Sequence, residues 1–233
     1  MIRTLRLSFA VLALALSASS ATAHAQFSAY GMFTVNRMTG INSSPILQTL
    51  SPLPCTGSNT TNCTSYTDRV NPLGFTGGVF YDFKTLGIVT LGVDLRGGVA
   101  SAKHGAQTYA NGTGAHIYDA LGGIRATFHT PYKLLAPYVQ GSVGYARSDF
   151  GVLTDALYNG TSFPANPIYP GIPTQNGIEY QGTAGLDLRV LPWADWRVTE
   201  LNYGAIQTSG TFSHSYPLYS VSTGIVFHIP PRP

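Results

Sequence analysis

The sequence is poor in charge. Lys+Arg number 13 and Asp+Glu 10 among 233 residues, so charged residues form 10% of the chain, against about 25% in typical soluble domains. Lysine occurs only at Lys84, Lys103 and Lys133. This scarcity of basic residues excludes a dense basic patch and argues against a nucleic-acid partner. A disordered chain is excluded as well, because such chains are apolar-poor and strongly charged, whereas 44% of these residues are hydrophobic.

Long apolar runs are missing beyond the first 25 residues. That opening segment has a basic start with Arg3 and Arg6, an apolar run from Phe9 to Leu16, and the small-residue pattern Ala23-His24-Ala25. These three features together predict a cleavable signal peptide over residues 1–25, with one domain over 26–233. Because no later stretch is long enough for a membrane helix, the exported chain is either soluble or a closed membrane barrel.

Cysteine is nearly absent, with Cys55 and Cys63 as the only two. In an exported protein such a pair predicts a disulfide. The histidines follow none of the spacings of zinc-binding motifs, so we expect no metal site and no cofactor.

A period of two dominates the chain from Gln26 onward. In Val89–Arg96 the odd positions are all Val or Leu, whereas the even positions are Thr, Gly, Asp and Arg. This alternation is typical of a strand with one apolar and one polar face. Similar alternation predicts eight strands, around residues 27–37, 75–83, 89–96, 118–128, 137–145, 178–190, 197–205 and 219–227.

The predicted connections alternate in length. Three are short, at 84–87, 130–134 and 191–194, and four are longer, at 38–72, 101–113, 148–177 and 206–216. Short turns at one end and long loops at the other are typical of outer-membrane barrels. The sequence therefore predicts an all-β fold, an eight-stranded antiparallel up-and-down transmembrane β-barrel, with a soluble lipid-carrying barrel as the alternative.

The two faces of the strands decide between these alternatives. The polar face is rich in Gly, Ser and Thr and too sparsely charged for a solvated surface, so we expect it to line the lumen and the apolar face to contact lipid. Several aromatic residues fall near the short turns, where a membrane-interface girdle is expected. They are Phe83, Phe128, Trp193, Trp196 and Phe227.

The predicted inward face carries charges that are costly in a narrow lumen unless they are paired. An eight-stranded barrel is just wide enough for its side chains to fill. We therefore expect a salt-bridged plug, with a gated pore for small solutes as the alternative. The residues of this predicted lumen network are Asp82, Asp94, Arg96, Asp119, Arg125, Asp187, Arg189 and Glu200.

Four segments resemble the OmpA-like outer-membrane β-barrel domain of small porin-like proteins of Gram-negative bacteria. They are 137–146 (PYVQGSVGYA), 185–189 (GLDLR), 195–198 (DWRV) and 222–227 (STGIVF). The resemblance implies a location in the outer membrane and a structural, adhesive or limited-permeability role. It also implies outer-membrane lipid, lipopolysaccharide and the barrel assembly machinery as partners, and a host or surface ligand on the long loops.

A lipid-modifying enzyme of the outer membrane is a further alternative. His214 lies between Ser213 and Ser215, and Glu200 precedes them on the neighbouring strand. However, Glu200 is predicted to face the lumen, and side chains on opposite faces of a barrel wall form no hydrogen-bonded triad. We therefore expect no enzymatic activity.

Overall fold

The computed structural model describes residues 26–41, 68–103, 115–132, 134–149, 174–209 and 213–229. Within this part of the chain no helix is long and apolar enough to cross a membrane. The predicted signal peptide and both cysteines lie outside the described residues. The strands are β1 (Gln26–Thr39), β2 (Arg69–Val70), β3 (Leu73–Leu86), β4 (Val89–Ser101), β5 (His116–Phe128), β6 (Leu135–Asp149), β7 (Thr174–Leu191), β8 (Ala194–Thr208) and β9 (Ser215–Ile229).

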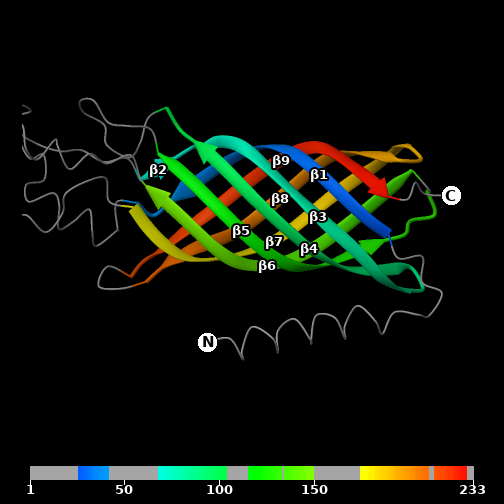
Figure 1. Ribbon diagram of the computed structural model, residues 1–233. Helices are drawn as coiled ribbons and strands as arrows, with labels where there is room; N and C mark the ends of the chain where they lie inside the picture. The colour runs from blue at the N-terminus through cyan, green and yellow to red at the C-terminus, as the bar shows by residue number, and fades with distance from the viewer. Residues whose placement is uncertain are drawn as a thin grey trace, which may run out of the picture.

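The strands form a closed barrel (Figure 1). From β3 to β9 each strand pairs antiparallel with the next, β3 also pairs with β1, and β1 pairs with β9 to close the cylinder. The two-residue β2 lies outside this ring of eight and extends it only locally, where Val70 pairs with Met38. The predicted eight-stranded antiparallel up-and-down barrel is therefore confirmed.

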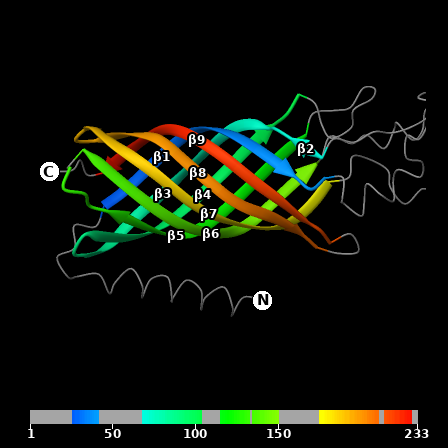
Figure 2. The same ribbon diagram turned by 180° about the vertical axis from the view of Figure 1, so that it is seen from behind.

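The two ends of the barrel differ, as expected. One end, here called the turn end, carries the tight turns at Gly87–Ile88 and Pro192–Trp193 and the connection at 129–134. Gly87 adopts φ +59°, a left-handed conformation that glycine tolerates without strain. At the other end, the loop end, the strands are joined by the longer connections, and Figure 2 shows this end of the strands, with β2, on the right. One of these is shorter than predicted, because β8 and β9 extend to leave only residues 209–214 between them.

The side-chain distribution is that of a membrane barrel. Along β4, Val93, Leu95 and Val99 are exposed, whereas Asp94 and Arg96 are buried. An apolar exterior around a polar interior is the arrangement required in lipid. It is the opposite of what a soluble lipid-carrying barrel would show, so that alternative is wrong.

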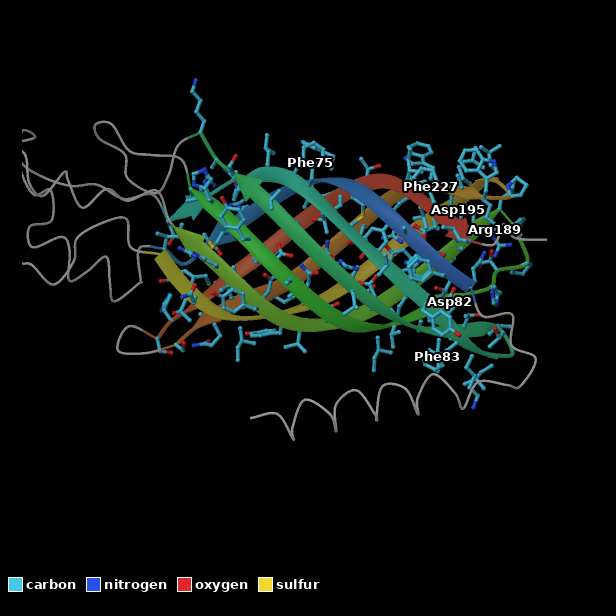
Figure 3. All side chains as sticks on the ribbon, in the orientation of Figure 1. Phe75, Asp82, Phe83, Arg189, Asp195 and Phe227 are labelled. Atoms are coloured by element: carbon cyan, nitrogen blue, oxygen red, sulfur yellow. The ribbon has the colours of Figure 1, made fainter. Side chains whose placement is uncertain are left out.

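Exposed aromatic residues gather near both ends of the barrel. At the turn end, Figure 3 shows Phe83 and Phe227 pointing away from the wall, and the Phe227 ring stacks on Trp193 with centroids 6.0 Å apart. Trp196 is exposed as well, and Phe128 is half-buried. Toward the loop end the sequence analysis assigned no girdle, but four exposed tyrosines occur there. They are Tyr118, Tyr145, Tyr203 and Tyr219.

Apolar side chains also fill part of the interior, which the alternation alone did not predict. At the loop end, apolar side chains from several strands form a layer across the interior, here called the loop-end apolar layer. Nearer the turn end a smaller cluster contains Tyr30, Met32, Phe80 and Val226. The loop-end apolar layer consists of Met38, Ile41, Val70, Ala102, Ala115, Ile117, Ala146, Ile206, Tyr216 and Leu218.

An arginine on the lipid-facing side should destabilise the barrel according to its depth. Leu95 is 63% exposed in the middle of β4, and Ile88 is 69% exposed in the turn before it. Leu95→Arg should lower the free energy of unfolding by about 2–4 kcal/mol, whereas Ile88→Arg should cost only about 0–1 kcal/mol. Urea unfolding in lipid vesicles, monitored by the difference in gel mobility between heated and unheated samples, measures the free energy of unfolding of both variants. Equal losses would contradict the assignment of the membrane-facing surface.

Candidate functional site

Six buried charges in the middle of the lumen form one continuous series of ion pairs. Asp94 and Arg96 are 3.0 Å apart on β4, and Arg96 reaches Glu200 of β8 at 2.9 Å. Glu200 also pairs with Arg197 at 3.1 Å. Asp187 of β7 then pairs with Arg197 at 2.8 Å and with Arg125 of β5 at 2.7 Å. We call this series, Asp94–Arg96–Glu200–Arg197–Asp187–Arg125, the ion-pair chain.

Positive and negative charges alternate along the ion-pair chain, so it is neutral as a whole. The side chains of all six residues are at most 3% exposed. Burial makes an unpaired charge costly, and here each internal member of the chain contacts two opposite charges. Removing an internal member would therefore leave two buried opposite charges each short of a partner.

Two tyrosines hold the ion-pair chain in place. The Tyr30 hydroxyl donates to Asp94, with Oη 2.9 Å from Oδ2, and the Tyr138 hydroxyl donates to Glu200. The Tyr138 ring also contacts two guanidinium groups, with its centroid 3.7 Å from Cζ of Arg125 and 4.7 Å from Cζ of Arg197. Such cation–π contacts favour the charged guanidinium groups in a site from which water is excluded.

Two inward-facing glycines make room for these rings. A Cβ atom at Gly185 would lie 2.3 Å from Cζ of Tyr138, and one at Gly78 would lie 2.6 Å from Oη of Tyr30. Gly185 is paired with Tyr138 across β6 and β7, and Gly78 is paired with Tyr30 across β1 and β3. The space that each glycine leaves on one strand is thus occupied by the large tyrosine side chain of the neighbouring strand.

Arg197 is the central residue that the sequence analysis missed. Simple alternation places it on the same face as the exposed Leu201, opposite Glu200. The pairing of β8 with β9 is interrupted between Arg197 and Glu200, where a β-bulge or similar irregularity shifts the register. Such a shift changes which positions face inward, and both side chains are fully buried.

Three predicted members of the lumen network lie outside the ion-pair chain, and two of them, Arg189 and Asp119, form no ion pair with a described residue. Arg189 is half-buried near the turn end, makes no ion pair with a described residue, and keeps its Nε without a hydrogen-bond partner. Asp82 lies at the same end, as Figure 3 shows. Asp119 lies toward the loop end and accepts a hydrogen bond from the backbone of Gly98. Alternation placed all three on the inward face correctly, but it contains no information about depth along the barrel.

A Ser–His–Asp series lies near the turn end. His228 Nδ1 is 2.8 Å from Oγ of Ser28, and its Nε2 is 2.9 Å from Oδ2 of Asp195. Ser28 is paired with His228 across the contact of β1 with β9, and Asp195 extends the series to β8. All three side chains are buried, with Ser28 at 0% exposure. The series therefore joins the first and last strands without presenting a hydroxyl to a substrate.

The residues considered for a lipid-modifying site do not come together. Glu200 is buried in the ion-pair chain. His214 lies at the loop end, where its Nε2 is 3.1 Å from the carbonyl oxygen of Gly40. Within the described ranges, no group of three or more His, Cys, Asp or Glu side chains is arranged to hold a metal ion.

These features define a transmembrane β-barrel whose lumen is occupied by paired charges. No protein-family model matches the chain, and no curated protein matches it by sequence. Solved structures with a similar outline are small barrels of bacterial surfaces and outer membranes, the class that the sequence segments also resemble.

Three of these structures illustrate the range. Ail, the attachment invasion locus protein of Yersinia pestis, is 10% identical, with 88% of this chain and 99% of that chain covered and a TM-score of 0.47. Neisserial surface protein A is 12% identical over 86% and 96% of the two chains, with a TM-score of 0.47. OprG from Pseudomonas aeruginosa is 12% identical over 87% and 95%, with a TM-score of 0.44. The fold assignment itself rests on the strand pairing described above.

Breaking the ion-pair chain at its centre should strongly destabilise the barrel. Arg197→Met leaves Asp187 and Glu200 with one cationic partner each and should cost about 3–5 kcal/mol. Arg189→Met is the matched control, because Arg189 makes no ion pair with a described residue, and it should cost less than about 1 kcal/mol. Urea midpoints of the two variants in the same lipid provide the comparison. Similar midpoints would show that the ion-pair chain contributes little.

Proposed function

We propose that the protein is a non-conducting barrel of the outer membrane with a structural or adhesive role. In this proposal the ion-pair chain is a plug, and the barrel is a stable anchor for the connections at its loop end. The observation that carries the proposal is the pair Arg96–Glu200, which joins β4 to β8 across the lumen at 2.9 Å with both side chains buried. Any solute path through the barrel would have to break this pair.

The loop-end apolar layer supports the same proposal. Its members come from β1, β2, β5, β6, β8 and β9 and from residues flanking β1, β4 and β5, and most are fully buried. An ion crossing this layer would lose its hydration without gaining a polar partner. A gated pore would need both this layer and the plug to move, so we prefer the non-conducting role to the pore.

The proposed location follows from the direction of the chain. With an even number of strands in the ring, β1 begins and β9 ends at the turn end, and the long connections leave from the opposite end. In bacterial outer-membrane barrels the short turns are periplasmic and the long loops are extracellular. We therefore propose a periplasmic turn end, with the long connections available to a host or surface ligand. Phe227, exposed on the last strand, is the aromatic residue that we propose for recognition by the barrel assembly machinery.

Conductance and stability measured together test the plug. In planar bilayers the wild-type protein should give no stable channel steps, because the ion-pair chain blocks the passage of ions through the lumen. Arg125→Ala removes one end of the ion-pair chain, leaves Asp187 with one partner, and should lower the urea midpoint strongly. Arg189→Ala is the control for loss of an arginine outside the chain. Ion-selective steps in the wild type, altered in a fully stable Arg125→Ala protein, would reject the plug and support a pore.

Lipopolysaccharide is the lipid partner that we propose for the loop end. Arg37 on β1, Arg69 on β2 and Arg147 on β6 are exposed near the loop ends of their strands, and exposed Lys103 follows β4. The four exposed tyrosines of that end lie nearby, since Arg37 pairs with Tyr219 and Arg147 pairs with Tyr118. Guanidinium groups bind phosphate oxygens in a bidentate manner. A ring of basic residues next to exposed tyrosines could therefore bind the phosphate groups of lipopolysaccharide in the outer leaflet.

Removing this basic ring should weaken lipopolysaccharide binding. The variant Arg37→Gln/Arg69→Gln/Arg147→Gln should bind about tenfold more weakly, a loss of about 1.4 kcal/mol, and the difference should shrink at high salt. The control is Lys84→Gln/Arg189→Gln, which removes charge from the turn end only. Binding of lipopolysaccharide to the purified proteins in detergent measures the effect. Equal weakening in both variants would show that the interaction depends on net charge rather than on the loop end.

A further inference from the structure

The outer wall of the barrel is hollowed by an open groove over four neighbouring strands, β7, β8, β9 and β1. Its volume is about 840 Å³, within the range of sites that hold a small organic ligand. Eight of its lining residues are exposed and form two adjacent rows across the paired strands. One row is Arg37–Tyr219–Tyr203–Gly182, and the other is Val35–Val221–Leu201–Ala184.

The floor of this groove is the backbone of the wall. A Cβ atom at Gly182 would meet only the backbone oxygen of Tyr203, at 3.8 Å, so the space outside this glycine is open. Asn202 and Ser220 also border the groove, although Nδ2 of Asn202 donates to Oγ of Ser220 in the interior, 3.0 Å away. Because their side chains lie inside the barrel, these two residues contribute backbone to the groove. The groove therefore belongs to the lipid-facing surface and is separate from the lumen.

The groove descends from the loop end toward the middle of the wall. Arg37 lies two residues before the loop-end terminus of β1, whereas Gly182 and Ala184 lie in the middle of β7. Three inter-strand spacings of about 4.8 Å separate β1 from β7, so each row is roughly 14 Å long. The hydrocarbon part of one bilayer leaflet is about 15 Å thick, half of the apolar core. The groove thus has about the length of one acyl chain of the leaflet at the loop end.

A cation marks the loop-end limit of the groove. Arg37 is exposed, and among the described residues no carboxylate forms an ion pair with it. Next to it in the row, the rings of Tyr219 and Tyr203 pack with centroids 5.1 Å apart, and tyrosine prefers the membrane–water interface. Apolar side chains alone select no lipid, because lipid tails are as apolar as leucine. Selection therefore depends on the head group, and a guanidinium group is suited to phosphate.

We propose that one acyl chain of a lipopolysaccharide molecule occupies this groove while a phosphate of the same molecule binds to Arg37. The inference rests on the lipopolysaccharide partner proposed above, and it assigns the part of the wall that the lipid contacts. The acyl chain packs against Val35, Val221 and Leu201, and the small residues Gly182 and Ala184 leave room for it. The phosphate is the anionic group that the exposed guanidinium lacks among the described residues.

Filling the groove tests the proposal. Gly182→Phe places a large ring where the acyl chain lies, and the open space at this position allows the barrel to fold. The matched control is Gly31→Phe, on the lipid-facing side of β1 but outside the groove, where a Cβ atom would meet nothing within 4 Å. The probes are lipid A, which is the phosphorylated and acylated part of lipopolysaccharide, and the same phosphorylated disaccharide without its acyl chains. Native mass spectrometry of the full mature chain in detergent micelles measures their binding.

The two probes separate the groove from the head-group contact. Gly182→Phe should bind lipid A about tenfold more weakly than the wild type, because a large side chain occupies the space of the ligand. It should bind the deacylated disaccharide as the wild type does. Gly31→Phe should match the wild type with both probes, whereas Arg37→Gln should bind both more weakly. Ala184→Leu narrows the groove from the adjacent row and gives the same comparison if Gly182→Phe does not fold.

The possible failures of the groove and of the lipid partner are distinguishable. Unchanged binding of lipid A by Gly182→Phe would overturn the groove and leave the lipopolysaccharide partner in place. A wild-type protein that binds neither probe would reject that partner, and the groove with it. If phosphatidylethanolamine displaced lipid A from the wild type as well as lipid A itself does, the groove would be a contact for any membrane lipid. If Gly182→Phe dissociated a dimer of the wild type, the groove would be an interface between two copies. Either of these last results would also overturn the proposal.

Discussion

The ion pair between Arg96 and Glu200 is the contact on which the interior of the barrel depends. It joins β4 to β8, which lie on opposite sides of the ring of eight strands, and each partner connects to a further opposite charge. Because these side chains are almost fully buried, none of the charges is stable without a partner. Because every buried charge needs an opposite charge beside it, this pairing constrains which residues face inward at the middle of the barrel. It also constrains the distance between β4 and β8.

The surrounding side chains are arranged to satisfy this requirement. Tyr30 and Tyr138 donate hydrogen bonds to acids of the ion-pair chain, and the Phe80 ring lies 4.2 Å from Cζ of Arg125. Gly78 and Gly185 leave the space that the two tyrosine rings occupy. Filling the lumen in this way leaves little room for solute passage. This filling supports the proposed non-conducting role.

Much of the fold could be predicted from the sequence because lipid and lumen impose a strict period of two. That period correctly placed Asp94, Arg96, Arg125, Asp187 and Glu200 inside and Leu95 and Phe227 outside. It failed for Arg197, because an irregularity in the strand pairing shifts the register at that point. The same period also places Ile117 and Phe80 inside, but nothing in the alternation indicated that apolar side chains would occupy inward positions.

Other parts of the candidate site could not be predicted, because they depend on contacts between residues distant in sequence. The Ser28–His228–Asp195 series joins β1, β9 and β8, and no local spacing indicates it. The depth of Glu179, which lies near both the ion-pair chain and the loop-end apolar layer, likewise depends on how the strands are staggered around the barrel, and alternation does not give that stagger.

The contact between β4 and β8 also has a mechanical consequence. A bilayer exerts lateral pressure on the wall of any cylinder inserted in it, and a thin single-layered wall can yield by becoming oval. An ion pair across the diameter opposes that deformation. An oval cross-section is longer in one direction, and lengthening along the ion pair would separate its two buried charges. The Arg96–Glu200 pair therefore makes the cross-section of the barrel stiff. The surface at the loop end is accordingly displayed on a rigid support, even where the surrounding membrane changes in composition or tension.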